Sequence, residues 1–536
     1  MVQDLLLWPA DKSAGPQVEN PEFAVTSHRT LKLDLKYTHL SPLDELCAGN
    51  VAMRHKNIIL AVFIIVAIVG CGKSSGARSS GLLTSQAEIS QTNGRSGQPG
   101  TDAILVSGPV CGRPDDQLPH LPPNWDTFTP PAVGQSYLDL TFGCPVKRLT
   151  NSSTDETTWD GKHLSFMNYY STLTPMNATD TMLLITSSNG AWRIRDVQGK
   201  IVIPAAKMPA FSGHPVWDAA DENIFYYTFR NSLYRATVAS KQVNSGVVHT
   251  FNEYDGVTSP DSADLSQDGD HIALIGKNRN NTIDVLVWSL RRRAKTSVYT
   301  TSCSISGTVT STSQPGCVHK LQLTANNLLT IGFAQEGRAP EEGVRLWNGS
   351  TLIHLQDKTD HYDTGYDLNG NSVFIACNNF MTLPGITNPC ASGWGMDVRQ
   401  INNLVSGICL LDHQPYWHVS YRGSVAQPWA AMSFFDSRTP GPEFFSGDGR
   451  YQRPTTGNWQ LYEDEIVVAK VDATRVYRLA HARSRSMESY WSQPHAAISR
   501  DGKYVVFSSN MAYPNGCPAN MHVADECSDV YMIKLH

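Results

Sequence analysis

The sequence predicts an all-β protein that folds as a β-propeller, and three observations lead to this prediction. From about residue 134 onward, short runs rich in β-branched and aromatic residues alternate with turn signals, as at 285–288, 372–376 and 504–508. No long amphipathic helix interrupts them, and a weak repeat recurs among them. About 400 residues of strand are too many for one open sheet, and seven blades of about 57 residues fit that length, with six or eight as alternatives.

The repeat is clearest in two places. The run LSQDGDHIAL at 265–274 matches ISRDGKYVVF at 498–507, and looser copies begin at Val216 and Tyr366. In each copy a short strand ends in Ser or Asp, and an Asp-Gly or Asn-Gly pair supplies the positive φ that a tight hairpin requires. A strand-built unit that recurs along the chain favours propeller blades over a two-sheet sandwich.

Three segments precede the propeller domain, which we place at 132–536. Residues 1–52 have no sustained period of either secondary structure, and we interpret them as an unstructured extension upstream of the true start at Met53. Residues 53–71 read as an export signal. Residues 72–131 are rich in Ser, Gly, Pro, Thr and Gln, and they predict a flexible tether because they cannot bury enough apolar surface to offset the entropy of ordering.

The export signal consists of the basic stub MRHKN at 53–57, an apolar run at 58–69 and small residues after it. The run is shorter than the ~20 residues that a membrane-spanning helix needs, and a buried core helix rarely carries an uninterrupted apolar run of this kind. The segment IVGC, ending at Cys71, resembles a bacterial lipobox. That resemblance implies acylation of Cys71 and a lipid anchor in the cell envelope, and Gly72 at the next position implies the outer membrane.

Composition excludes several functions. A net charge of −6 and a pI near 6.3 leave no electrostatic footprint for nucleic acid, and the basic run at 291–293 is interpreted as a solvated turn. The sequence has no Gly-x-Ser-x-Gly elbow for a serine hydrolase and no Gly-rich phosphate loop.

The cysteines of the exported part predict disulfides. Metal binding is the competing interpretation, but no Cys-x-x-Cys or Cys-x-x-His spacing supports it. Three pairs of cysteines flank polar or Pro/Gly-rich loops. Of the cysteines that remain, two form the natural fourth pair, and Cys409, in an apolar run, is expected to be a buried thiol. The predicted pairs are Cys303 with Cys317, Cys377 with Cys390, Cys517 with Cys527, and Cys111 with Cys144.

The carboxyl end contains a sequence motif that is typical of a known group of propellers. The stretch ISRDGKYVVFSSN, followed by DVYMIKL, resembles the S-x-D-G-x-x-[ILV]-x-[FY]-x-S-[ND] blades of the TolB-type, WD40-like bacterial β-propellers. This resemblance implies the propeller fold and says little about activity, because propellers host many unrelated functions.

Candidate site residues stand ahead of the hairpins, where the inner strands that line a propeller channel would begin. Convergent imidazoles with Gln or Asp suit a divalent transition metal, while Arg422, with His163 as a second catalytic candidate, could stabilise a carboxylate or enolate. The competing interpretation is that these side chains hydrogen-bond neighbouring blades. The metal-ligand candidates are His214, His361, His418, His495 and Gln493.

The histidine constellation resembles the oligogalacturonate lyases, propeller enzymes that hold manganese with histidines and a glutamine and cleave acidic sugars by β-elimination. By this resemblance His495 falls at a ligand position of the last blade, and the cofactor would be manganese. Gln493 departs from the pattern, because it stands where the first histidine of that motif would be.

Candidate ligand-binding residues accompany the histidines, and two functions stay open. Trp417, Tyr490 and Trp491 would suit stacking against sugar rings, with Asp363 beside them, although half-buried aromatics also pack blades together. The leading hypothesis is a lipid-anchored envelope propeller that binds an envelope protein or an acidic glycan without chemistry of its own. The alternative is an enzyme similar to the oligogalacturonate lyases, so whether the protein is an enzyme stays open.

Overall fold

The computed structural model describes residues 108–536, apart from gaps at 260–262, 307–316, 359–360, 378–385, 394, 413–416, 435–458, 486–491 and 525. All structural statements below concern these described residues. The predicted extension, the predicted export signal with Cys71 and the predicted tether up to residue 107 lie outside them.

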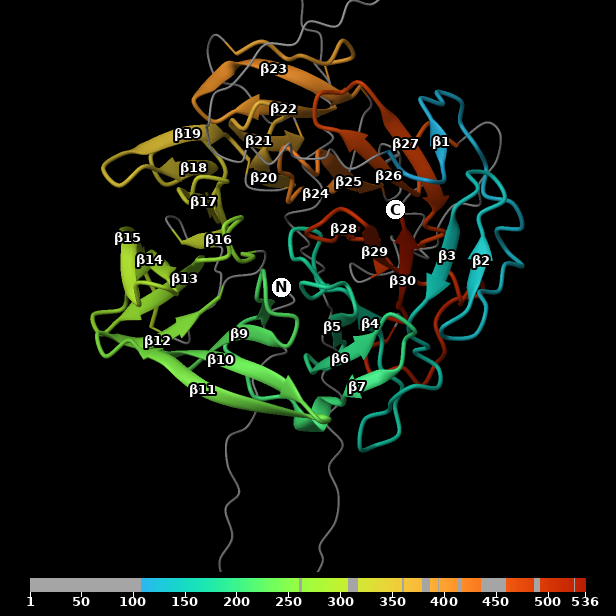
Figure 1. Cartoon of the computed structure of the whole chain (residues 1–536), viewed down its shortest axis with the longest axis horizontal. Helices are drawn as coiled ribbons and strands as arrows, with labels where there is room; N and C mark the ends of the chain where they lie inside the picture. Colours follow the sequence, from blue (N-terminus) through green and yellow to red (C-terminus); the bar gives the residue numbers. More distant parts are fainter. Residues whose placement is uncertain are drawn as a thin grey trace, which may run out of the picture. The chain divides into compact units, whose positions relative to one another are not determined.

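Seven antiparallel sheets surround a central axis as the blades of a propeller (Figure 1). Five sheets have four strands in sequence order, and two have five strands. The prediction of an all-β, seven-bladed propeller is confirmed. No helix in the described part of the chain is long and apolar enough to cross a membrane.

The first five blades each use consecutive strands, numbered from the axis outward. Blade 1 contains β4 (Phe166–Met167), β5 (Met182–Ser187), β6 (Trp192–Asp196) and β7 (Ile201–Ile203). Blade 2 contains β8 (Val216–Trp217), β9 (Ile224–Phe229), β10 (Ser232–Ala239) and β11 (Gln242–Thr250). Blade 3 contains β12 (Tyr254–Thr258), β13 (His271–Asn278), β14 (Thr282–Ser289) and β15 (Ala294–Ser304). Blade 4 contains β16 (Val318–Leu323), β17 (Leu329–Phe333), β18 (Val344–Trp347) and β19 (Leu352–Gln356). Blade 5 contains β20 (Tyr362–Tyr366), β21 (Ser372–Cys377), β22 (Met396–Gln400) and β23 (Asn403–Leu411).

The last two blades combine strands from both ends of the domain. Blade 6 contains β24 (Trp417–Ser420), β25 (Trp429–Phe434), β26 (Glu465–Lys470), β27 (Val476–His481) and the edge strand β1 (Arg113–Pro114). Blade 7 contains β28 (Ala497–Ile498), β29 (Tyr504–Ser509), β30 (Asp529–Lys534), β3 (Pro145–Arg148) and β2 (Ser136–Leu138). Pairing of β3 with β30 closes the ring. The ion pair of Arg148 with the buried Asp529, at 2.6 Å, reinforces the closure.

The segment before β2 also belongs to the propeller. Its strand β1 pairs with β27, its Cys111 forms a disulfide with Cys144, and its Trp125 is buried. The predicted tether at 72–131 therefore includes a part, from residue 108, that lies against blade 6.

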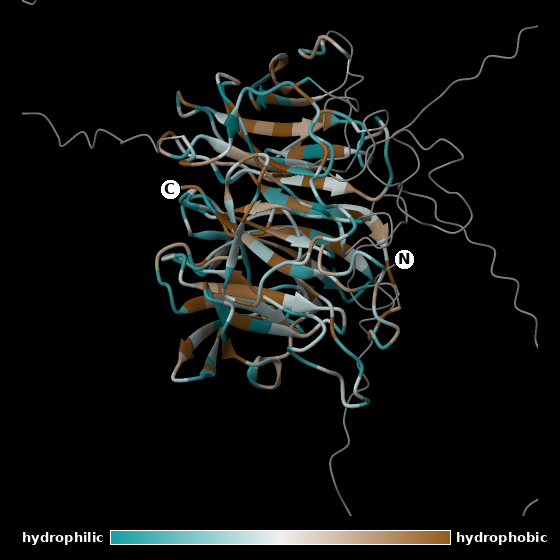
Figure 2. Cartoon of the chain, turned by 90° about the vertical axis from the view of Figure 1, so that its right-hand side faces the viewer, coloured by the Kyte–Doolittle hydropathy of each residue, from teal (hydrophilic) through white to brown (hydrophobic). Residues whose placement is uncertain are grey.

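The core lies in the seams between blades. Each of the seven hydrophobic clusters joins two neighbouring sheets, as where Leu183 and Ile185 of β5 meet Val506 of β29 and Met532 of β30. Many central strands bury consecutive residues and carry hydrophobic stretches (Figure 2), as expected when both faces of each sheet pack on neighbouring blades.

The repeat observed in the sequence forms the hairpin between the first and second strands of a blade. In blade 3 the Gly269 amide donates to the Ser266 carbonyl at 3.0 Å, and in blade 7 the Gly502 amide donates to the Ser499 carbonyl at 2.9 Å. Both glycines have positive φ, +70° and +77°, which explains the Asp-Gly pairs.

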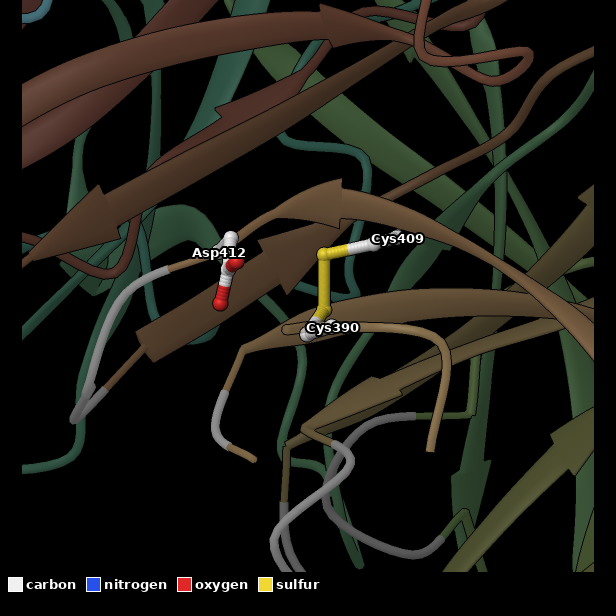
Figure 3. Close-up of side chains that lie close together, drawn as sticks. All are labelled: Cys390, Cys409 and Asp412. Atoms are coloured by element: carbon white, nitrogen blue, oxygen red, sulfur yellow. A yellow bond between two sulfur atoms is a disulfide. The ribbon is translucent and has the colours of Figure 1, made fainter. Parts of the chain in front are cut away.

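Three of the four predicted disulfides are confirmed, and the fourth is wrong. The bonds Cys111–Cys144, Cys303–Cys317 and Cys517–Cys527 are present. Cys390 bonds to Cys409 of β23 (Figure 3). Cys377 belongs to none of the four disulfides. The segment before β22 lies against the outer strand β23, as the approach of the Cys390 sulfur to the carbonyl of Leu411 shows. The loop spacing alone did not indicate this route, and Cys409 is consequently not a thiol.

Candidate functional site

Three histidines from consecutive blades meet where the inner strands begin. His361 directly precedes β20, His418 is the second residue of β24, and His495 lies two residues before β28. The ring centroids of His361 and His418 are 4.8 Å apart, and those of His418 and His495 are 4.1 Å apart. The structure thus brings three of the predicted metal-ligand candidates together, and we call them the histidine cluster.

Gln493 and Tyr170 complete the surroundings of the cluster. The Nε2 atom of His418 lies 2.9 Å from the side-chain oxygen of Gln493, which places this predicted residue beside the cluster. The ring of Tyr170, which follows β4 of blade 1, lies 5.4 Å from the rings of both His418 and His495. Four neighbouring blades therefore contribute side chains to one end of the channel.

Burial keeps two of the imidazoles neutral. It lowers the pKa of His418 well below its ordinary value, and the nearby imidazoles of His495 and His361 lower it further. Burial, assisted by His361, also lowers the pKa of His495 to about 3. A neutral imidazole has a nitrogen lone pair with which to accept a proton or bind a metal.

Lys320 is a neighbouring residue that the sequence analysis missed. It lies on β16, is buried, and donates from Nζ to the carbonyl of Tyr362 at 2.9 Å. The ammonium lies 4.2 Å from the centroid of the Tyr362 ring and 5.4 Å from that of Tyr170. The sequence could have indicated this residue, because Lys320 lies inside the strand VHKLQL, and a charged residue inside an inner strand faces the channel or a partner.

Arg422 lies in a buried ion-pair cluster further along the inner strands. Its Nε is 3.4 Å from Oδ2 of Asp264, and its Nη2 is 3.8 Å from Oδ1 of Asp363. Nη2 also donates to the carbonyl of Thr172 at 2.5 Å and to the side chain of Gln322 at 3.4 Å. These partners come from blades 1, 3, 4 and 5, so Arg422, a residue only 3% exposed, links them to blade 6.

Arg500 extends the same cluster from blade 7. It donates to the carbonyls of Leu265 and Ser266 and lies 3.7 Å from Asp264. Burial raises the pKa of Asp363 to about 6, although the Arg422 charge opposes this effect. Burial also opposes ionisation of Asp264, but the charges of Arg422 and Arg500 prevail and lower its pKa. We call Arg422, Asp264, Asp363 and Arg500 the ion-pair cluster.

The other predicted site residues lie elsewhere or outside the description. His214 is buried, places Nε2 2.8 Å from the carbonyl of Ala263 and has its ring 5.6 Å from that of Tyr169. His163 lies in the connection before β4, where its amide donates to the carbonyl of Asn520. The side chain of Trp417, and all of Tyr490 and Trp491, lie outside the described residues.

The histidine cluster has side chains of the kinds that bind a metal, but their ligand atoms are not arranged around a common point. Among the described residues, one group of His, Cys, Asp and Glu ligand atoms lies within 4.8 Å of one another, namely Cys390, Cys409 and Asp412. Its two sulfurs form a disulfide (Figure 3), which removes the thiolates that a metal would need. The histidine cluster offers neutral imidazoles and an amide oxygen, which divalent transition metals accept, after side-chain shifts that would bring the nitrogens to a common point.

Comparisons with known proteins add solved structures with a similar chain path. No family model matches the sequence, and no curated protein does either. An oligogalacturonate lyase from Vibrio parahaemolyticus has 8% identity and a TM-score of 0.47, with 75% of this chain and 96% of that chain covered. TolB from Acinetobacter baumannii has 14% identity and a TM-score of 0.27, covering 59% and 64%. The RRP9 WD40 repeats have 12% identity and a TM-score of 0.38, covering 73% and 97%. The assignment to the seven-bladed β-propellers rests on this chain's own strand order and ring closure.

Proposed function

We propose that the protein is a lipid-anchored β-propeller of the bacterial cell envelope that binds its ligand at the histidine cluster. The observation that carries the proposal is the ring contact of His361, His418 and His495 at one end of the channel. The lipobox at Cys71 supports the anchor and the compartment, and disulfides in the propeller suit an oxidising environment. An envelope protein or an acidic glycan is the partner class that we propose.

The distribution of charge favours binding over chemistry. Arg422, the group expected to stabilise developing charge, is already balanced by Asp264 and Asp363. The cluster itself offers uncharged imidazoles beside the buried ammonium of Lys320, which lies over the Tyr170 and Tyr362 rings. Such a group of side chains can donate hydrogen bonds to the oxygens of a ligand and attract an anion.

A metal-dependent lyase is the second candidate, and the same three imidazoles favour it. His361, His418 and His495, with Gln493, would hold a divalent metal such as manganese. When bound, the metal would polarise the carboxylate of a uronate by Lewis-acid action. Lys320 would attract that carboxylate, and Tyr170 would pack against the sugar.

Metal content and glycan binding distinguish the two candidates. The protein, expressed from Met53 and purified without chelator, is to be compared with His418→Ala and with the control His214→Ala, which alters a buried histidine outside the cluster. A lyase is expected to carry near-stoichiometric metal and to form an unsaturated product from polygalacturonate, and His418→Ala should lose both. A binding propeller is expected to bind glycan or partner without product, with binding lost only in His418→Ala. Equal behaviour of the two variants would contradict both candidates.

The anchor has its own test. Cys71→Ala is expected to move the protein from the detergent phase to the aqueous phase, because stable membrane attachment requires more than one acyl chain and acylation begins at this thiol. Translation from Met53 should leave partitioning unchanged. A Cys71→Ala protein that remains in the detergent phase would contradict the lipid anchor.

A further inference from the structure

A tryptophan at the tip of a hairpin is the most exposed large apolar side chain in the described part of the chain. Trp159 is 99% exposed, in the connection between β3 of blade 7 and β4 of blade 1. Neither the core of the propeller nor the histidine cluster explains an aromatic side chain in this position. Large aromatic side chains held in water are typical of surfaces that bind a partner.

The tip is a defined turn. The Gly161 amide donates to the Thr158 carbonyl at 3.0 Å, and the Thr158 amide donates to the Lys162 carbonyl at 2.8 Å. The Lys162 amide also donates to the Thr158 hydroxyl at 3.0 Å. Gly161 has a φ of +80°, which a glycine adopts without strain, so the backbone on both sides of Trp159 is fixed.

Buried cations hold the base of this hairpin. Nε of Arg193 lies 2.9 Å from Oε1 of Glu156, and Nη2 of Arg195 lies 2.8 Å from Oδ2 of Asp155. Both arginines come from β6 and are buried, with their guanidinium carbons 4.8 Å and 5.3 Å from the centroid of the Phe166 ring. Burying two cations is costly unless their partners are well placed, so this arrangement fixes the base firmly.

A second loop braces the hairpin from the side. The His163 amide donates to the Asn520 carbonyl at 2.9 Å, and the His522 amide donates to the His163 carbonyl at 2.7 Å. The disulfide Cys517–Cys527 closes that loop. Because the turn, its base and the adjoining loop are all held by these contacts, the backbone that carries Trp159 would lose little conformational entropy on binding a ligand.

The hairpin lies at the same end of the propeller as the histidine cluster. In an antiparallel blade, the connection into the first strand and the connection between the second and third strands lie at one end. The hairpin is a connection into β4, and its bracing loop joins β29 to β30 of blade 7. The histidines stand at the beginnings of inner strands, which is also this end.

The surroundings of Trp159 are polar. Its neighbours in the turn are Thr158, Asp160, Gly161 and Lys162, and no other large exposed apolar side chain lies in this hairpin or in residues 510–524 and 526–528. A protein interface of standard size, or insertion into a membrane, would call for further exposed apolar residues around the indole. A single flat ring in a turn that also carries the carboxylate of Asp160 and the ammonium of Lys162 matches a sugar ring instead, which has an apolar C–H face and hydroxyls at its rim.

We infer that Trp159 is a stacking platform for a pyranose ring of a glycan, and that Asp160 and Lys162 bond its hydroxyls. This surface site is separate from the histidine cluster. Wild-type affinity in Trp159→Ala would overturn this inference and leave the proposed function untouched, whereas a protein that binds no hexamer would overturn this inference and also count against an acidic glycan as the partner.

The test compares Trp159→Ala and Trp159→Phe with the wild type, and Leu140→Ala is the control because Leu140 is 72% exposed in the turn between β2 and β3. Hexamers of galacturonate, glucose and N-acetylglucosamine, all in pyranose form, are titrated by calorimetry. For a hexamer that the wild type binds, Trp159→Ala is expected to weaken binding by roughly 3- to 10-fold, as for the loss of one aromatic contact. Trp159→Phe should keep most of the affinity, and Leu140→Ala should keep all of it.

A second measurement does not depend on the variants folding equally well. In the wild-type protein, a bound hexamer should shield one exposed indole from acrylamide quenching, and Trp159→Ala should lack that quenchable indole. The inference is overturned if no hexamer binds, or if Trp159→Ala binds as the wild type does. It is also overturned if Trp159 proves necessary instead for binding phosphatidylethanolamine–phosphatidylglycerol vesicles or for dimer formation in sedimentation.

Discussion

The two levels of the channel bury polar side chains in opposite ways. In the histidine cluster, uncharged imidazoles lie in ring contact, with two pKa values lowered by burial. In the ion-pair cluster, Arg422 and Arg500 lie close to the carboxylates of Asp264 and Asp363. Charges that balance one another hold blades together, whereas neutral donors and acceptors remain chemically suited to a ligand. We therefore expect the ion-pair cluster to contribute mainly to stability and the histidine cluster mainly to ligand binding.

Removing Arg422 is expected to have the largest effect. Arg422→Ala leaves the buried carboxylate of Asp363 without its ion-pair partner and leaves Asp264 with Arg500 alone, so the free energy of unfolding should fall by about 3–5 kcal/mol. Urea denaturation measures this change. Arg291→Ala, which removes a guanidinium whose side chain is 74% exposed, is the control and should change stability by less than about 0.5 kcal/mol. A stable Arg422→Ala protein that had lost ligand binding would reverse the roles of the two levels.

The pH dependence of stability should have opposite signs at His495 and at Asp363. His495 has a folded pKa of about 3, below its ordinary 6.5, so its contribution to stability is present above that value and is lost as the pH falls toward 3. Asp363 has a folded pKa of about 6, above its ordinary 3.8, so its contribution is present at low pH and is lost as the pH rises through 6.

Variants separate these two contributions in metal-free protein. Between pH 4 and 6, His495→Gln should reduce the loss of stability on acidification, and Asp363→Asn should reduce the loss on raising the pH. Urea midpoints at intervals across this range provide the measurement. If the urea midpoint of both variants depends on pH as it does in the wild type, the pKa values of His495 and Asp363 are not shifted as the structure indicates.

The smallest expected effect concerns Gln493. Gln493→Ala removes the contact with Nε2 of His418, and the free energy of unfolding should fall by about 0.5–1.5 kcal/mol. Ligand affinity should fall as well, because His418 would lose a group that orients its ring. Calorimetric titration alongside thermal unfolding checks both; a change in stability without a change in affinity would make Gln493 purely structural.

The fold could be predicted because its signal is local. The Asp-Gly turns at Gly269 and Gly502 lie in short hairpins whose two strands are adjacent in sequence, so pattern and structure coincide. The pairing of Cys390 with Cys409 could not be predicted in the same way. It depends on how the segment before β22 crosses to β23, and loop spacing carries no information about that route.

The site was predictable only in part, for the same reason. His361, His418 and His495 precede or begin inner strands, so their place in the repeat indicated a common end of the channel. Lys320 and Asp264 were missed because their importance comes from partners in other blades, far away in the sequence. The carboxylates that pair with Arg422 could not be identified either, because they come from blades 3 and 5.

The closure of blade 7 also determines when the protein can become native. Arg148 and Asp529, which meet in the closing sheet, are 381 residues apart in sequence. During synthesis the chain cannot make this contact until nearly the whole domain has emerged, and contacts of such long range form slowly. Until then, the seams beside the unfinished blade expose apolar surface to other molecules in the same compartment. For this architecture, the interval between emergence and ring closure is the period of greatest risk of proteolysis and aggregation.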